Sequence, residues 1–331
     1  LTTADANTAV GYNAGTSITT GGSNVMVGYL AGDAIADGNK NTIIGSEAAG
    51  ALNSGTNNVI IGTEAGAALT SGTYSVFIGT NAGDGHDTEG SNIGIGYDAL
   101  GGSIAGGENN VAVGIYALDA LTSADFCVAA GYQALTNCTT GGSNIALGRL
   151  AGDAVVDEDY TVCIGHGAGD DYIGAQSIML GAFTRQHSDG DNETNSICIG
   201  YGVNTGRANQ IHFGNTSVTA IKGQVSTSTY SDERIKRDIV DNDLGLEFVN
   251  KLTPRKFKRR DPEEYADLFG EINKAPIKDE EKEKVFDGLI AQEVEAVCNE
   301  LGVNFSGHEV STSQGNKQSI QYEALTIPLI K

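Results

Sequence analysis

Residues 23–32 read SNVMVGYLAG, and similar decapeptides recur along the first two thirds of the chain. Residues 57–66 read NNVIIGTEAG, residues 91–100 read SNIGIGYDAL and residues 143–152 read SNIALGRLAG. A glycine follows each apolar triplet, and successive glycines stand 17 residues apart, with slippage of a few residues late in the series. Self-similarity at a fixed period of this length is typical of a solenoid of stacked coils. The glycines are Gly11, Gly28, Gly45, Gly62, Gly79, Gly96, Gly114, Gly131, Gly148, Gly165, Gly181, Gly200 and Gly214.

Each apolar triplet predicts a short β-strand, one in every coil. The residues one and three places before the glycine, such as Val25 and Val27, are nearly all β-branched, which suits a strand. Because side chains alternate along a strand, we expect these two to line the inside of the coil and the residue between them to point outward. The middle residue is apolar as well, at Met26, Ile43, Ile60, Phe77, Ala112, Ala146, Cys163, Met179 and Cys198. Strands that are apolar on both faces are usually buried on both faces. The pattern therefore predicts that another layer of the same chain or, more simply, neighbouring chains cover the outer face.

The residues around the triplet predict how the coils turn and stack. The glycine permits a left-handed corner, and the alanine three places later, as at Ala31, permits close packing of coils. Thirteen coils about 4.7 Å apart would form a rod roughly 60 Å long. Asparagine recurs one place before the strand, where its side chain can bond to a turn backbone or stack in a ladder. It does so at Asn24, Asn41, Asn58, Asn92, Asn110 and Asn144.

The register resembles the head repeats of trimeric autotransporter adhesins, which are left-handed parallel β-rolls, and similar repeats in phage tail fibres. The resemblance covers residues 1–214 and lies in the repeated pattern. It implies a mostly β fold, a parallel β-roll or β-solenoid, assembled as a homotrimer. It also implies a surface-binding role with a host-surface receptor as partner.

Charge and hydropathy exclude several function classes. The 331-residue chain has a formal net charge of -22, so it repels phosphate backbones and anionic lipids. No window approaches 18 consecutive apolar residues, and the N-terminus has no apolar signal region. We therefore expect no nucleic-acid binding and no membrane insertion. Because the chain begins at Leu1, we expect it to be a fragment of a longer protein.

The sequence changes character after the repeats. Residues 1–230 hold 5 basic and 21 acidic residues, whereas residues 231–331 hold 15 and 21. Residues 215–230 are rich in serine and threonine and are expected to form a connector. A small α+β domain is then predicted at residues 231–331, with a charged insertion at residues 259–283.

The second region resembles the intramolecular-chaperone domain that ends endosialidase tailspikes, many other phage tail fibres and the myelin regulatory factor family. The matching motifs, in order, are Ser231-Asp232-x-Arg234-x-Lys236, Leu252–Phe257, Gly288–Val294 and Tyr322–Lys331. The resemblance implies a catalytic Ser–Lys dyad of Ser231 and Lys236, which cuts the Tyr230–Ser231 bond. The family's long C-terminal helix would begin where this chain stops.

Such a cut is chemically reasonable. A serine hydroxyl is a weak nucleophile, and a lysine can accept its proton only if burial or nearby charge lowers the lysine pKa from about 10.4 toward neutral. Ser231 would be the nucleophile and Lys236 the general base. Because a trimer interface can desolvate the amine, we expect cutting to follow assembly. An alternative interpretation makes Ser231 the N-cap of a helix, with Asp232 and Glu233 in the first turn.

No conventional active site, metal site or cofactor is expected in the repeats. The histidines form no visible set with a nucleophile, and the five cysteines lack paired metal-ligand spacing and are interpreted as small core residues. Two acidic clusters, residues 157–159 and residues 189–193, could hold a cation or could serve only as solubilising loops.

Together these features predict a structural segment of a phage tail fibre or spike in the virion, which releases its chaperone domain by one autoproteolytic cut. Two alternatives stay open. One is the head of a bacterial trimeric adhesin, and the other is a self-processing domain that releases an upstream module.

Overall fold

The computed structural model describes residues 5–103, 106–171, 173–186, 194–205, 208–215, 217–218, 220–221, 236–239, 241–260, 264, 282–311 and 317–330. The chain divides into two units, Leu1–Asn215 and Thr216–Lys331, and each is described by itself. The predicted mostly β fold with a parallel β-solenoid is confirmed. Most of the predicted connector lies outside the described residues.

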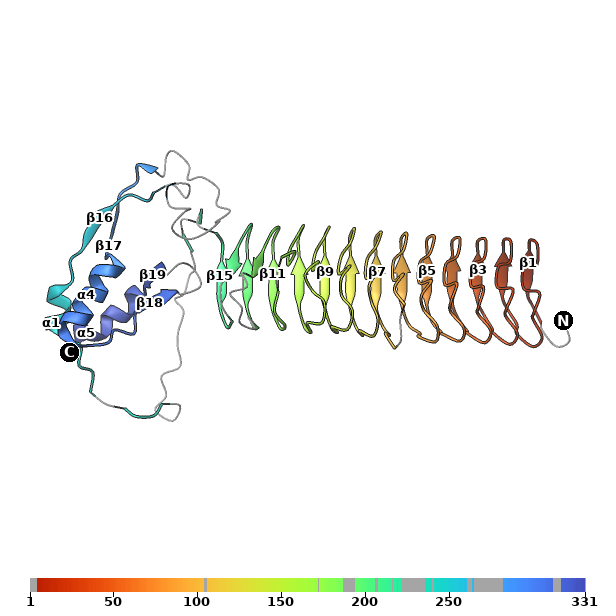
Figure 1. The fold of residues 1–331 in the computed structure, drawn as a ribbon, viewed down its shortest axis with the longest axis horizontal. Helices are drawn as coiled ribbons and strands as arrows, with labels where there is room; N and C mark the ends of the chain where they lie inside the picture. The colour runs from red at the N-terminus through yellow and green to blue at the C-terminus, as the bar shows by residue number, and fades with distance from the viewer. Residues whose placement is uncertain are drawn as a thin grey trace. The chain divides into compact units, whose positions relative to one another are not determined.

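The first unit is a solenoid whose coils each contribute one strand to a parallel, thirteen-stranded sheet (Figure 1). Three-residue strands recur because each triplet, with β-branched residues at most of its first and third positions, is followed by a glycine at which the chain turns. A second, two-stranded parallel sheet pairs β12 (Arg185–Gln186) with β14 (Asn204–Thr205). The strands of the large sheet, in order, are β1 (Thr8–Val10), β2 (Val25–Val27), β3 (Thr42–Ile44), β4 (Val59–Ile61), β5 (Val76–Ile78), β6 (Ile93–Ile95), β7 (Val111–Val113), β8 (Val128–Ala130), β9 (Ile145–Leu147), β10 (Val162–Ile164), β11 (Ile178–Leu180), β13 (Ile197–Ile199) and β15 (Ile211–Phe213).

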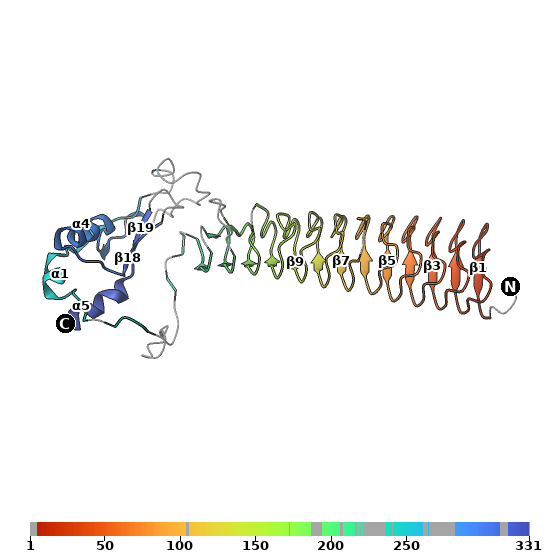
Figure 2. The ribbon, with the colours of Figure 1, turned by 60° about the horizontal axis from the view of Figure 1, so that its bottom comes forward.

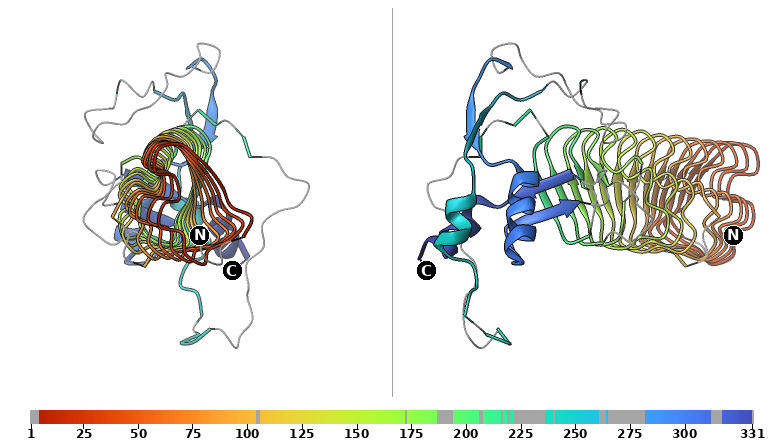
Figure 3. Two further views of the ribbon diagram at one scale, coloured as in Figure 1. Left: turned by 90° about the vertical axis from the view of Figure 1, so that its right-hand side faces the viewer. Right: turned by 60° about the vertical axis from the view of Figure 1, so that its left-hand side comes forward.

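Successive coils stack with equivalent residues above one another, as the end-on view of the solenoid shows (Figure 3). Met26 of β2 lies over Ile43 of β3, for example. The glycine after the strand is required for this stacking. Gly45 has a φ of +145°, and a Cβ atom there would lie 2.2 Å from the carbonyl oxygen of Gly62 in the next coil. Any larger residue would push adjacent coils apart.

The sequence prediction of which strand residues face inward is wrong, because the inner and outer positions are exchanged. The middle residues, such as Met26 and Ile43, are 0% exposed and fill the coil, whereas flanking residues such as Val25 and Ile44 are 37% and 38% exposed. Period two requires the middle residue to face away from its neighbours, but it does not say which side is inside when both are apolar. The coil interior also receives the alanines after the strand and a second aliphatic column that includes Leu52.

The predicted asparagine ladder is present inside the solenoid. The backbone amide and the side-chain Nδ2 of Asn41 both donate to Asn24 Oδ1, at 2.9 and 3.1 Å. Asn41 Nδ2 also donates to the carbonyl oxygen of Gly55 at 2.8 Å. Buried polar groups need such partners, so the ladder lets one turn of each coil be buried.

The second unit has a small core of its own, formed by helices and two antiparallel hairpins. Helix α1 (Leu246–Lys251) lies against α4 (Ala291–Leu301) and against the short helix α5 (Thr326–Ile330). Phe248 of α1 packs on Phe305, with ring centroids 5.2 Å apart. The buried apolar residues of this core are Leu244, Phe248, Val294, Cys298 and Phe305.

Two antiparallel strand pairs connect these helices, and the second pair is labelled beside α4 and α5 in Figure 2. Strand β16 (Arg255–Phe257) pairs with β17 (Phe286–Gly288), and β18 (His308–Ser311) pairs with β19 (Lys317–Ile320). A 3-10 helix, Tyr322–Leu325, leads from β19 into α5. Most of the charged insertion between β16 and β17 lies outside the described residues.

Candidate functional site

The residues predicted to cut the chain are only partly within the described structure. Tyr230 and Ser231 lie outside the described residues, whereas Lys236 is described and is exposed to solvent. The pairing of the Ser231 hydroxyl with the Lys236 amine therefore stays a prediction from the sequence.

Three of the four sequence motifs of the second unit meet in space. Arg255, from the second motif, forms a two-pronged ion pair with Glu293 of the third, with Nε–Oε2 and Nη2–Oε1 distances of 3.1 and 2.9 Å. The backbone amide of Leu289, in the third motif, donates to the Tyr322 hydroxyl of the fourth at 2.8 Å. These two contacts join residues that are 38 and 33 positions apart in the chain.

Gly288 explains one feature of the third motif. A Cβ atom at this position would lie 2.5 Å from the Tyr322 hydroxyl oxygen. Glycine therefore leaves room for the Tyr322 hydroxyl, whose oxygen accepts the hydrogen bond from the Leu289 amide. The partners of Arg255 and Tyr322 were not predicted from the sequence. Their motifs were recognised, but a linear motif does not say which of its side chains face one another.

Comparison with known families supplies the deciding observation for this unit. Residues 231–303 match the family model described as chaperone of endosialidase. An endosialidase-type chaperone domain follows the repeats. The match begins at Ser231 and ends at Val303, just after α4, so it includes α1, β16, β17 and α4. A search of curated proteins found no match to the chain.

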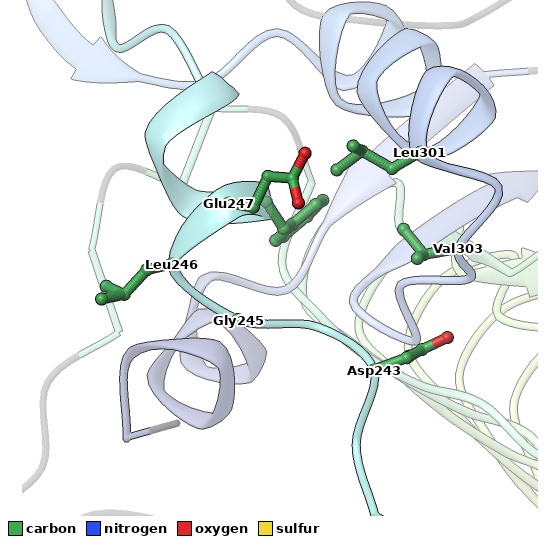
Figure 4. A pocket seen from close by; sticks show the side chains of 7 residues that line it. Asp243, Gly245, Leu246, Glu247, Leu301 and Val303 are labelled. Atoms are coloured by element: carbon green, nitrogen blue, oxygen red, sulfur yellow. The ribbon is translucent and has the colours of Figure 1, made fainter.

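The described part of the second unit has an open hollow beside α1. This hollow has a volume of about 460 Å³ and lies between α1 and the end of α4. Asp243 and Glu247 bring carboxylates to it, Leu301 and Val303 bring apolar side chains, and the Leu246 side chain points away from these residues (Figure 4). No nucleophile or histidine is among the residues that line it.

The chaperone domain has a sparse core and exposed apolar side chains. Five apolar residues form its buried cluster among the described positions. Large apolar side chains of the same domain remain exposed, including Leu246, Val285, Tyr322 and Leu329.

The solenoid carries an apolar surface, here called the seam, formed by the first and third residues of its thirteen strands. None of these residues is charged. Twelve steps of about 4.7 Å give the seam a length of roughly 56 Å. Tyrosines that directly follow the glycine make the seam wider. Tyr12 and Tyr29, for example, are exposed and stack with ring centroids 5.5 Å apart. Contiguous apolar strips of this length are unusual on the surface of a monomeric protein.

The described acidic cluster, residues 157–159, gives no support for a cation site. Asp159 Oδ1 accepts the Gly142 amide at 2.7 Å, and Glu158 Oε2 accepts the Val156 amide at 2.7 Å, so both carboxylates act as turn acceptors. The residues 189–193 lie outside the described structure. Among the described residues, no three His, Cys, Asp or Glu side chains are grouped to hold a metal ion. Within the same part of the chain, no helix is both long and apolar enough to span a membrane.

Proposed function

We propose that the protein is a trimeric fibre or spike segment of a phage virion, assembled by its chaperone domain and matured by one cut before Ser231. The observation that carries the proposal is the family match that begins at Ser231, immediately after a solenoid whose seam is uncovered in the single chain. A host-surface receptor would then be the partner of the mature fibre.

Assembly through the seam has a physical basis. Each apolar square ångström removed from water contributes about 25 cal/mol, so a long strip of exposed valine and isoleucine favours association strongly. The absence of charge at the seam positions means that pairing copies buries no unpaired ion. The resemblance to trimeric fibres sets the proposed number of copies at three.

The proposed cut needs only the chain and water. The Ser231 Oγ atom bonds to the carbonyl carbon of Tyr230 while Lys236 accepts the hydroxyl proton. The bond from that carbon to the Ser231 nitrogen breaks, and the nitrogen takes the proton from Lys236. Water then hydrolyses the ester, which leaves a carboxylate on Tyr230 and a free amine on Ser231.

The exposure of Lys236 in the single chain favours coupling of the cut to assembly. A lysine acts as a base near neutral pH only when burial or neighbouring charge disfavours its protonated form. Burial against neighbouring chains would provide that change, so a correctly formed trimer would cut itself and an isolated chain would not.

Intact-mass spectrometry tests the cut with matched variants. We expect the wild type to yield a C-terminal fragment that starts at Ser231, whereas Ser231→Ala and Lys236→Ala stay whole. Ser228→Ala and Lys222→Ala are the controls, because they remove the same groups on the other side of the bond, and both should be cut like the wild type. Cutting of Ser231→Ala at the same bond, or a wild-type trimer that stays whole, would contradict the proposal.

A further inference from the structure

Two cysteines of the solenoid meet inside one coil. Cys127 stands at the asparagine-ladder position just before β8, and Cys138 stands in the aliphatic column that elsewhere holds Leu52, Leu69 and Leu121. Both are fully buried. The repeat thus replaces a ladder residue and a core residue by cysteine in the same coil.

The two thiols share one acceptor. Cys127 Sγ lies 3.4 Å from the carbonyl oxygen of Gly141, and Cys138 Sγ lies 3.2 Å from the same atom. The neighbouring Cys138 thiol lowers the pKa of Cys127, while the Cys127 thiol together with burial raises the pKa of Cys138. Backbone amides of Asn144 and Ser143 further lower the pKa of Cys127, because they stabilise its thiolate.

The arrangement differs from that of the other cysteines in the solenoid. Cys163 and Cys198 are the middle residues of β10 and β13, and Met179 of β11 lies between them in the stack. They are therefore two strand spacings apart, roughly 9 Å, which is too far for a disulfide. Only Cys127 and Cys138 are juxtaposed among the cysteines of this unit, all of which lie at described positions.

We propose that Cys127 and Cys138 form a disulfide when the protein meets a peroxide, and that this bond cross-links one coil through its interior. Hydrogen peroxide is small enough to enter when the coil opens locally. The Cys127 thiolate attacks one peroxide oxygen and becomes a sulfenic acid, and the second oxygen leaves as water after taking up protons. Cys138 sulfur then displaces the sulfenic hydroxyl, which leaves as a second water.

The balance is two thiols and one hydrogen peroxide giving one disulfide and two waters. The sulfur atoms lose two electrons in total, and the peroxide bond gains them. The new bond would close a short loop from the start of β8 to the turn before β9, and it would restrict the unfolded chain. This proposal is independent of the cut and of trimer formation.

The test uses the full chain carrying Ser231→Ala, so that it stays whole. The protein is treated with hydrogen peroxide at neutral pH, quenched, unfolded and alkylated with iodoacetamide. We expect alkylation of all five cysteines before treatment and of three afterwards, since two of the five enter the disulfide. A peptide map should show a link between Cys127 and Cys138 that a reductant reverses. The oxidised protein should also unfold at a higher urea concentration.

Matched variants separate this pair from general thiol oxidation. Cys163→Ala should keep the link, whereas Cys138→Ala should lose it and should oxidise Cys127 only as far as sulfenic or sulfinic acid. Asn110→Cys combined with Leu121→Cys recreates the geometry one coil earlier and should add a second link. If five thiols remain after treatment, or if the map shows oxidised Cys127 and Cys138 without a link, the proposal is wrong. The wild-type map decides this even if a variant fails to fold.

Discussion

Asn58 shows how a single residue type holds three coils in register. Its backbone amide and its side-chain Nδ2 donate to Asn41 Oδ1, and its own Oδ1 accepts the Ser75 amide of the next coil at 2.9 Å. Because these groups are buried, each would be costly to leave without a partner. The sequence predicts this ladder because asparagine recurs at a fixed place, and a ladder needs only that recurrence.

His86 stands in the aliphatic column, 17 residues after Leu69, and it carries a pH prediction. Its ring is fully buried against Phe77, and neither ring nitrogen has a hydrogen-bond partner among the described residues. Burial lowers the pKa of His86 to about 4. Between about pH 6.5 and pH 4 the unfolded chain binds a proton that the folded chain does not, so acid destabilises the fold through this residue.

We expect the substitution His86→Leu to reduce this acid sensitivity. The free energy of unfolding of the wild type should fall between pH 7 and pH 5 by roughly 2 kcal/mol more than that of the variant. The difference between the two proteins is the relevant quantity, since burial raises the pKa of Asp84 to about 6 and Asp84 acts in the opposite direction. Urea unfolding at a fixed protein concentration measures it. Equal losses in the two proteins would show that His86 is not buried as described.

At the scale of elements, the seam distinguishes two neighbouring residues of the same strand. Ile43 is buried inside the coil, whereas Ile44 lies on the seam. Ile43→Asp places a charge in the core and should unfold the solenoid locally, at a cost of several kcal/mol. Ile44→Asp should leave the fold of the single chain intact. It should separate the assembled chains, because it places a charge on the seam, and it should therefore reduce cutting of the Tyr230–Ser231 bond.

Circular dichroism and light scattering separate these outcomes, and Thr140→Asp, on an exposed turn, serves as the control for added charge. If Ile44→Asp unfolds the coil and Ile43→Asp only separates the copies, the assignment of the two strand faces would be reversed.

The comparison of Ile43 with Ile44 also shows how much the sequence could predict. Strand positions, corner glycines and the ladder follow from the repeat, because each depends on local chemistry. The inner face does not, because both faces of each triplet are apolar. In the chaperone domain, residues 244–252 have a helical pattern and α1 spans Leu246–Lys251. The Arg255–Glu293 and Leu289–Tyr322 contacts join distant segments, and the sequence gives no sign of them.

At the scale of the whole molecule, two units with different chemistry follow one another in a single chain. The solenoid is stabilised by repetition and leaves one apolar face uncovered, while the chaperone domain has a small core. Both features have the same explanation if the chains assemble side by side, because neighbouring copies then cover what each chain leaves exposed.

The most direct test of this account is the mass of the assembly formed by the full chain carrying Ser231→Ala, measured by light scattering over a range of concentrations. The account predicts a single species with three times the mass of the 34.2 kDa chain. A species of 34.2 kDa at every concentration would contradict it, because the seam would then remain exposed to water in the native protein.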